Sequence, residues 1–477
     1  MRVLFVASEL FPYVKTGGLG DVMAALPRAM RALGADVRIL VPAYPAILNA
    51  VLVQGEVGYL PDIMGGGPAH ILKAEADGLP LYLLDQPGHF NRKGLPYDYS
   101  EDLPRRFAAL SFAAAHLGRV GDSEGWRPEV LHGHDWPTGL MPAYVAFGGG
   151  PRPATVMTIH NIAFQGRFSR TILPDLWLPP QAYTQEGVEY HGDIGFLKAG
   201  LRLVDRISTV SPTYAKEIQH FGGHGLEGLL AHRSKDLRGI LNGVDKTIWN
   251  PATDPHIQSR YDLRHPSRRP ANRTDFQRRL GLQEDPAAPL FVSVGRLDPL
   301  KGLDLVLDNV DHLVHRGGQL VLIGSGDPHA EGAFRQAAQR HPGRVAVFIG
   351  YDEVLAHRAF AAADVVLVPS RQEPCGLTQL YAQVYGALPL VRRTGGLADT
   401  VVGATAETLA NGTATGFMFD AASGWALGEA LNSAFDLFAD PAGWRQVQRQ
   451  GMKADFSWAG PAQAYLDLYA TIPPKGH

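Results

Sequence analysis

Cysteine is almost missing from this chain of 477 residues: Cys375 is the only one, so no disulfide can form within the chain. A lone thiol is typical of proteins in a reducing compartment, and we expect a cytoplasmic protein. The sequence also lacks an uninterrupted apolar stretch of about 18 residues, so no transmembrane helix is predicted. The opening run MRVLFVASEL has no cleavage-site pattern, and we interpret it as a strand and not as a signal peptide.

An excess of charge of one sign is missing too. The 44 basic and 47 acidic residues give a net charge of −3, which provides no general attraction to nucleic acid or to an anionic membrane. Hydrophobic residues make up 45% and charged residues 19%, close to ordinary globular usage, which excludes wholesale disorder. Glycine is abundant, with 54 residues, but it shows no three-residue period, which excludes collagen. We expect these glycines at turns and at close backbone approaches.

Short apolar runs alternate with helix-length segments in two series. The first series contains RVLFVA, DVRILVP, EVLHGH, TVMTIH and RISTV, and the second contains PLFVSVG, QLVLIG, RVAVFIG, DVVLVPS and LPLVRR. A polar stretch rich in proline and arginine, about 247–272, separates them. Continuous apolar strands with helical crossovers predict an α/β fold with parallel sheets covered by helices. We expect two Rossmann-like domains facing each other across a deep cleft, at 1–243 completed by the C-terminal helix 456–477, and at 244–455.

Three local features refine this pattern. Pro27 lies inside the helical pattern after the first strand, which predicts a kink or two short helices. Residues 71–85 alternate around a turn containing glycine, so we expect a hairpin at the edge of a sheet. The last helix is expected at about 461–470.

A phosphate-binding loop is indicated directly after the first strand. In ELFPYVKTGGLGDV, Lys15 precedes Gly17 and Gly18 at the start of a helix. Glycines let backbone N–H groups approach anionic oxygens, and both the helix dipole and the lysine favour the anion. A tight strand-to-helix turn with a surface lysine explains this segment equally well on local pattern alone.

Two more loops follow strands of the second series. Arg296 and Lys301 in GRLDPLKGLDLV suit a clamp on a diphosphate leaving group, or alternatively an arginine capping the sheet and a solvated lysine. Gly324 begins an incomplete G-x-G-x-x-G pattern, whose third glycine position holds His329, so the pattern gives little support to NAD binding.

A carboxylate and a further glycine pair come next. Glu373 lies at a strand end before a helix start, where it suits hydrogen bonding to sugar hydroxyls, or simply interaction with the helix dipole. Gly395 and Gly396 form another strand-to-helix turn. Cys375 has no evident partner, and we expect packing or backbone contact, not nucleophilic chemistry.

Histidines gather at two predicted strand ends. His132 and His134 lie in LHGHDW and His160 lies in TIHN. An H-x-H pair opens the alternative of a metal hydrolase, but the chain offers no C-x-x-C, no H-E-x-x-H and no clear complement of ligands, so we predict no metal and no cofactor. Asp135 beside Trp136 is more typical of a carbohydrate contact.

Taken together, these segments resemble the bacterial glycogen synthases and plant starch synthases of glycosyltransferase family 5. The resemblance runs from Met1 to about Asp420 and keeps the family's order and spacing. It is carried by the N-terminal strand and by KTGGLGDV, HGHDW, TIHNIAFQG, FLKAGL, TVSPTYAKEI, GILNGVD, GRLDPLKGLDLV and PSRQEPCGLTQLYAQVYGALPLVRRTGGLADTV.

The resemblance implies a GT-B architecture whose last helix crosses back to the N-terminal domain. It implies transfer of glucose from ADP-glucose to the non-reducing 4-OH of an α-1,4-glucan (glycogen), with retention of the anomeric configuration. The implied enzyme is an ADP-glucose:1,4-α-D-glucan 4-α-D-glucosyltransferase, with no nucleic-acid or membrane partner. The sequence leaves open the oligomeric state and a related retaining transferase that uses UDP-glucose or another acceptor. A sugar-nucleotide epimerase and a non-catalytic glucan-binding scaffold are more distant alternatives.

Site residues follow from the same resemblance. Lys15, Arg296 and Lys301 would hold the diphosphate, Glu373 would hydrogen-bond the transferred glucose, and His160 would contact it and present its backbone carbonyl near the anomeric carbon. The implied binding residues are Gly17, Gly18, Asp21, Tyr97, Asp135, Asn242, Gly324, Cys375, Gly376, Thr394, Gly395 and Gly396, with Tyr351 stacking on the adenine.

One position departs from the wider group of retaining GT-B enzymes. Many of them have a second glutamate eight residues after the first, and this glutamate binds the ribose. Here that position is Tyr381, so the ribose contact is left unassigned.

Overall fold

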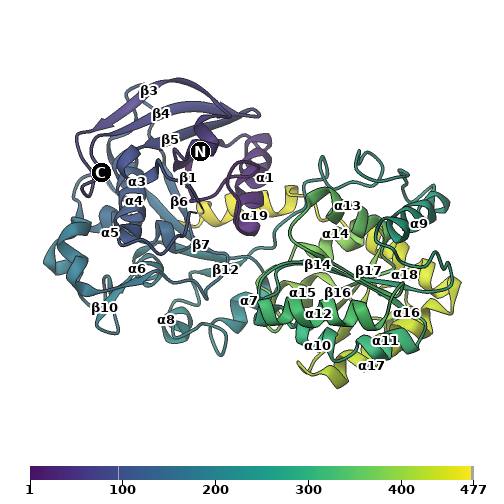
Figure 1. Cartoon of the computed structure of the whole chain (residues 1–477). Coiled ribbons are helices and arrows are strands. Elements are labelled where there is room, and N and C mark those ends of the chain that lie inside the picture. Colours follow the sequence, from purple (N-terminus) through teal and green to yellow (C-terminus); the bar gives the residue numbers. More distant parts are fainter. Residues whose placement is uncertain (95, 474–477) are drawn as a thin grey trace. The chain divides into compact units, whose positions relative to one another are not determined.

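The computed structural model describes residues 1–94 and 96–473. The chain divides into two compact units, Met1–Gly243 with Trp458–His477 as unit one, and Val244–Ser457 as unit two (Figure 1). Among the described residues, no helix combines the length and apolar character needed to cross a bilayer.

Unit one is built on a sheet with nine strands in the described part, in the order β12-β11-β7-β6-β1-β2-β5-β4-β3. All neighbours are parallel except β5–β4 and β4–β3. The strands are β1 (Arg2–Val6), β2 (Asp36–Pro42), β3 (Leu52–Leu60), β4 (Ala69–Ala76), β5 (Leu79–Asp85), β6 (Val130–His134), β7 (Ala154–Ile159), β11 (Arg206–Thr209) and β12 (Leu237–Gly239). A small sheet contains β8 (Arg167–Phe168), β10 (Asp193–Gly195) and β9 (Glu189–Tyr190).

The helices of unit one pack against this sheet or against one another. They are α1 (Gly18–Ala32), α2 (Pro45–Leu48), α3 (Pro87–Phe90), α4 (Leu103–Val120), α5 (Met141–Phe147), α6 (Phe196–Leu203), α7 (Pro212–Glu217), α8 (Glu227–His232) and α19 (Ala459–Ala470). Three 3-10 turns are η1 (Trp136–Thr138), η2 (Arg170–Leu176) and η3 (Pro180–Ala182).

Two local predictions for unit one need correction. Helix α1 runs without interruption through Pro27, so two short helices are wrong. Pro27 and Leu26 are both buried, and the packing of this face offsets the hydrogen bond that proline cannot make. The hairpin is confirmed as β4 and β5, but it is not at the sheet edge, because β3 pairs outside it.

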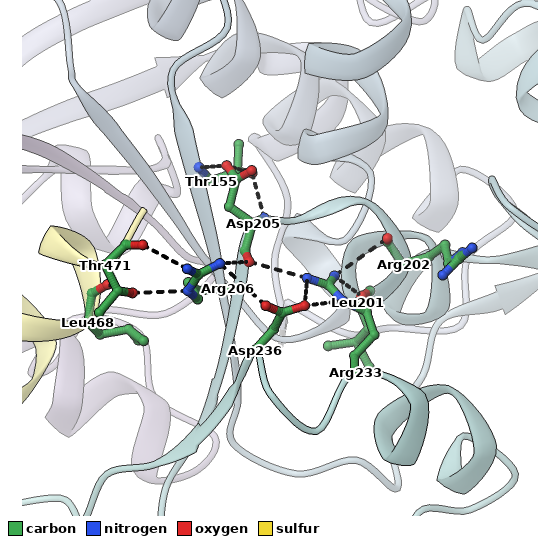
Figure 2. A network of polar contacts seen from close by, with 9 residues as sticks. All are labelled: Thr155, Leu201, Arg202, Asp205, Arg206, Arg233, Asp236, Leu468 and Thr471. Atoms are coloured by element: carbon green, nitrogen blue, oxygen red, sulfur yellow. Dashed lines mark hydrogen bonds and ion pairs between the residues drawn. The ribbon is translucent and has the colours of Figure 1, made fainter. Parts of the chain in front are cut away.

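The C-terminal helix α19 packs against α1, and its end is anchored to the sheet of unit one (Figure 1). In β11, the Arg206 guanidinium donates to the hydroxyl and the carbonyl oxygen of Thr471, at 3.0 and 2.7 Å (Figure 2). Asp236 accepts from Arg206 at 3.3 Å and from Arg233 at 2.8 Å. A charged network thus ties the end of α19 to β11 and to the loop before β12.

Unit two has a parallel sheet, with strands in the order β15-β14-β13-β16-β17-β18 in the described part. These are β13 (Leu290–Val294), β14 (Gln319–Gly324), β15 (Val345–Ile349), β16 (Val365–Val368), β17 (Leu388–Arg392) and β18 (Phe417–Phe419). The helices are α9 (Pro270–Arg279), α10 (Leu303–Leu307), α11 (Val310–His315), α12 (Pro328–Arg340), α13 (Glu353–Ala362), α14 (Thr378–Val384), α15 (Gly395–Thr400), α16 (Ala406–Ala410), α17 (Gly424–Phe438) and α18 (Pro441–Lys453), with 3-10 turns η4 (Pro266–Arg268) and η5 (Pro299–Lys301).

Both faces of the unit-two sheet are buried. Along β13, Phe291 belongs to one apolar cluster, while its neighbours Leu290 and Val292 belong to another. Because side chains alternate along a strand, the two clusters lie on opposite faces of the sheet. This explains why the strands read as continuous apolar runs, and it confirms the predicted helix-covered parallel sheet.

Candidate functional site

In unit one, the loop between β1 and α1 is organised by a carboxylate that the sequence analysis did not single out. Glu9 is 3% exposed. Its two oxygens accept from the Thr16 backbone N–H at 2.8 Å, the Thr16 hydroxyl at 2.6 Å and the Tyr97 hydroxyl at 2.6 Å. Gly17 adds a longer N–H bond at 3.3 Å. Glu9 therefore sets the path of the glycine loop, and the hydroxyl of Tyr97, which also bonds Ser8, is engaged in holding that loop.

The candidate phosphate-binding cation of this loop is already paired. Lys15 Nζ lies 2.8 Å from Asp21 Oδ1, and about a quarter of each side chain is exposed. Helix α1 begins at Gly18 without a side-chain cap. Lys15, Asp21 and the glycines at the start of α1 thus lie together at the carboxyl end of β1. Helix N–H groups and a cation at such a position favour an anion.

Asp135 and His160 come together at the ends of β6 and β7. Asp135 Oδ1 accepts from the backbone N–H of His160 at 2.7 Å and of Asn161 at 3.4 Å. Burial raises the pKa of Asp135 to about 7, against the effect of these two N–H bonds. Asp135 also has a φ of 56°, a left-handed value that is uncommon outside glycine. Its carboxylate therefore fixes the backbone that carries His160.

The H-x-H pair forms a buried group with His160. His132 bonds the Tyr469 hydroxyl at 2.7 Å and the Thr158 hydroxyl at 2.6 Å through its two ring nitrogens. His134 Nδ1 lies 2.9 Å from His160 Nε2. Burial lowers the pKa of His132 and of His160 to about 3 and that of His134 well below its usual value, so the three rings are neutral at pH 7. Both nitrogens of His132 are occupied by hydroxyls, an arrangement that does not favour the metal-hydrolase alternative.

In unit two, Lys301 and Glu373 form a close ion pair. Lys301 Nζ lies 2.9 and 2.7 Å from the two carboxylate oxygens of Glu373, which is 7% exposed. Ser370 donates to the same carboxylate at 2.8 Å. Both charged side chains line a pocket with Arg296, and this pocket lies at the carboxyl ends of β13 and β16. A cation and an anion side by side suit a ligand with both phosphate and hydroxyl groups.

Arg296 is the free cation of this pocket. Its side chain is exposed and has no hydrogen bond or ion pair to the described residues. The backbone beside it is crowded, because a Cβ on Gly324 would lie 1.8 Å from the Gly295 carbonyl oxygen. Glycine at 324 is thus required for the close approach of β13 and β14, independently of any ligand.

The glycine pair after β17 is held against the loop that carries Glu373. A Cβ on Gly395 would lie 1.9 Å from the Glu373 carbonyl oxygen, and one on Gly396 would lie 2.1 Å from that of Cys375. The Gly396 N–H donates to the Glu373 carbonyl oxygen at 3.1 Å. Thr394 is buried at the N-cap of α15. The loop that carries Glu373 and Cys375 therefore packs directly against the turn formed by Gly395 and Gly396.

The remaining named residues are more scattered. Asn242 is buried after β12 in unit one, and Gly376 adopts a left-handed φ of 73°. Tyr351 is 67% exposed after β15, and its hydroxyl donates to Glu353 at 3.0 Å. Tyr381 stacks on Trp249 with ring centroids 4.0 Å apart, so the ring at the position of the second glutamate contributes to packing within unit two.

Comparisons with known proteins agree with both units. Residues 2–232 match the family model of the starch synthase catalytic domain, and residues 273–444 match that of glycosyl transferases group 1. The chain is 48% identical to a glycogen synthase of Rhodopseudomonas palustris (strain BisB18), covering 99% of this chain and 97% of that protein. It is 47% identical to glycogen synthase 1 of Rhizobium meliloti (strain 1021), and both chains are covered completely.

Solved structures give the same result. The catalytic domain of starch synthase IV from Arabidopsis thaliana, bound to ADP and acarbose, is similar with a TM-score of 0.88 and 32% identity, and 98% of each chain is covered. A sucrose-phosphate synthase from Thermosynechococcus elongatus, at 19% identity and a TM-score of 0.60, shares the fold. The predicted GT-B architecture is confirmed. The chain belongs to the family of bacterial glycogen synthases and plant starch synthases, glycosyltransferase family 5.

Proposed function

We propose that the chain transfers glucose from ADP-glucose to the non-reducing 4-OH of an α-1,4-glucan, with retention of the anomeric configuration. The observation that carries this proposal is the Lys301–Glu373 pair beside Arg296, in a chain 48% identical to a glycogen synthase over nearly its whole length. The pair offers a cation to a leaving diphosphate and a carboxylate to sugar hydroxyls within one pocket.

Breaking the glycosidic bond places negative charge on the departing ADP. Arg296 and Lys301 from unit two and Lys15 from unit one bind its diphosphate and stabilise that charge electrostatically. Tyr351, with its exposed ring, stacks on the adenine. Backbone N–H groups in the glycine loops approach phosphate or sugar oxygens, at Gly17, Gly18, Gly376, Gly395 and Gly396. The further residues of the proposed binding site are Asp21, Tyr97, Asn242, Gly324, Cys375 and Thr394.

Positive charge develops at the same time on the glucose ring. Glu373 hydrogen-bonds the sugar hydroxyls, and the His160 carbonyl oxygen faces the anomeric carbon. A retaining glycosidase uses two carboxylates about 5 Å apart for a double displacement. Here the carboxylate of Glu373 is bonded to Lys301 and Ser370, and Asp135 is bonded to the backbone of its own unit. Attack on the front face therefore fits these residues better, with the departing phosphate accepting the proton of the acceptor hydroxyl.

The experiment is elongation of glycogen by the purified chain with ADP-glucose, with ADP release and new α-1,4 linkages measured together. UDP-glucose at equal concentration is the competing donor. We expect ADP release that depends on the acceptor and a clear preference for ADP-glucose. Absence of ADP release in the presence of glycogen would refute the proposal, while a preference for UDP-glucose would favour the related transferase.

We also propose a cytoplasmic location, since a single buried thiol, Cys375, is typical of proteins kept in a reducing compartment. Fractionation of the source cells tests this, and recovery outside the cytoplasmic fraction would contradict it.

A further inference from the structure

The buried histidines of unit one contain one polar atom without a partner. His134 is fully buried, and its Nε2 atom makes no hydrogen bond in the described part of the chain. Its other ring nitrogen, Nδ1, lies 2.9 Å from His160 Nε2. Both rings are neutral, because burial lowers the pKa of each well below 6.5. Each ring therefore carries one proton, and the two nitrogens that meet share one hydrogen bond.

Only two proton arrangements are compatible with this contact. In the first, His134 carries its proton on Nδ1 and donates to His160, which leaves a lone pair unpaired at His134 Nε2. In the second, His160 donates from Nε2, which leaves a buried N–H group unpaired at His134 Nε2. Buried N–H groups without an acceptor are rarer in proteins than acceptors without a donor. The first arrangement is therefore favoured, and it fixes the proton of His160 on its Nδ1 atom.

The surroundings hold His134 in the orientation that this requires. Its ring stacks on that of His132 with centroids 4.3 Å apart and lies 5.1 Å from the ring of Phe5. His132 is fixed in turn by the hydroxyls of Tyr469 and Thr158. Three neighbours thus restrict rotation of the two stacked rings, and Tyr469 of α19 contributes from the C-terminal end of the chain.

His160 has a second ring nitrogen, Nδ1, which takes no part in the contact with His134. The His160 side chain is partly exposed, its Nδ1 atom bonds none of the described residues, and its backbone is fixed by Asp135 at 2.7 Å. We propose that His134 is a positioning residue, whose Nδ1–H donates to His160 Nε2 and thereby keeps a hydrogen-bond donor at His160 Nδ1 for a hydroxyl of the donor sugar. The contact to the sugar rests on the function proposed above, whereas the proton arrangement does not.

The resting protein provides the first test. In protein labelled with 15N in the histidine rings, the chemical shifts and long-range proton couplings distinguish a ring protonated on Nδ1 from one protonated on Nε2. The signals of His160 are identified by their loss in His160→Gln. We expect the Nδ1–H form for His160 and for His134. An Nε2–H form of His160 in the wild-type protein would overturn the proposal whatever the enzyme's activity.

Matched variants provide the second test. In His134→Leu the donor is lost, and we expect a mixture of the two forms of His160 and a kcat about tenfold to hundredfold lower, the effect of one hydrogen bond to a polar substrate group. His134→Asn places an amide N–H near the position of Nδ1, and it should restore the Nδ1–H form and most of the kcat. An unchanged His160 spectrum and kcat in His134→Leu would overturn the proposal.

Tyr469→Phe is the structural control. It removes one hydrogen bond from His132 but leaves the contact between His134 and His160 in place. We expect lower stability and an unchanged His160 spectrum. If Tyr469→Phe shifts the His160 signals as far as His134→Leu does, packing and not the His134 donor sets the proton position, and the proposal fails.

Discussion

Lys301 Nζ lies within 2.9 Å of both carboxylate oxygens of Glu373, although the two residues are 72 positions apart in the chain. Glu373 is 7% exposed, and its carboxylate receives a third bond from Ser370. A buried carboxylate needs such partners, because desolvation of an unpaired charge is costly. Each member of the pair therefore stabilises the other in the free protein, and both line the same pocket.

The Glu373 carboxylate is expected to act on the sugar through its charge. Replacement by the isosteric glutamine keeps the side-chain volume but weakens its hydrogen bonds to sugar hydroxyls as positive charge develops. We expect Glu373→Gln to lower kcat about a hundredfold or more, the effect of losing one group that stabilises the transition state. Steady-state kinetics with ADP-glucose and glycogen measure this. A kcat near that of the wild type would show that Glu373 is assigned the wrong role.

Lys15 is expected to act on the donor diphosphate. Lys15→Ala should lower kcat/KM for ADP-glucose about a hundredfold or more, because one charged contact to the leaving group is lost. Lys73→Ala is the matched control, since Lys73 forms an exposed ion pair with Glu124 in the same unit. Equal loss in both variants would indicate a general effect of charge and not a site.

Replacing two glycines of the proposed site by alanine should have different effects, on stability in one case and on donor binding in the other. Gly395 has a φ of 44°, and a Cβ there would lie 1.9 Å from the Glu373 carbonyl oxygen, so Gly395→Ala should destabilise unit two by several kcal/mol. A Cβ on Gly17 would meet no atom within 4 Å, and the φ of −157° suits any residue. We expect Gly17→Ala to keep the urea midpoint but to weaken donor binding. A Gly17→Ala enzyme with unchanged KM for ADP-glucose would refute a close ligand approach at that loop.

The neutral histidines predict that stability falls in acid. Folding lowers the pKa of His132 and of His160 to about 3, whereas an unfolded histidine titrates near 6.5. Below pH 6.5 the unfolded state binds protons that the folded state does not, so the free energy of unfolding decreases as the pH falls. At pH 5 the loss is about 2 kcal/mol for each such histidine. Urea unfolding at pH 7.5 and pH 5 measures it, and an equal or higher midpoint at pH 5 would contradict the assignment.

Asp135 has the opposite effect on how the free energy of unfolding changes with pH. Its pKa is raised to about 7 in the folded protein, so the folded state binds a proton that the unfolded state releases between pH 7 and about 4. This contribution increases stability as the pH falls through that range. Asp135→Asn removes this contribution while keeping an oxygen that can accept from the His160 N–H. The free energy of unfolding should therefore decrease more steeply as the pH falls. A less steep decrease in this variant than in the wild type would mean that Asp135 is ionised in the folded protein over this whole pH range.

Most strands predicted from the sequence are largely buried central strands, since burial on both faces produces an uninterrupted apolar run. The β4–β5 hairpin was predicted instead from its alternation around a turn. β3 shows no such run, because its first five residues are exposed, and β8 to β10 have only two or three residues each. Among the site residues, the sequence pointed to Lys15, Lys301 and Glu373 singly. It could not indicate that Lys15 pairs with Asp21, or Lys301 with Glu373, because tertiary contacts decide such pairs. Glu9 was missed for the same reason: its role depends on Tyr97, 88 residues further along the chain.

The transfer reaction itself tests the central claim most directly. The purified chain is incubated with ADP-glucose labelled in the glucose and with glycogen, and the label in the polymer is compared with the ADP released. We predict one ADP per glucose added, label only in α-1,4-linked units at non-reducing ends, and near-complete loss of both in Glu373→Gln. Release of ADP with free glucose and no labelled polymer would contradict the account.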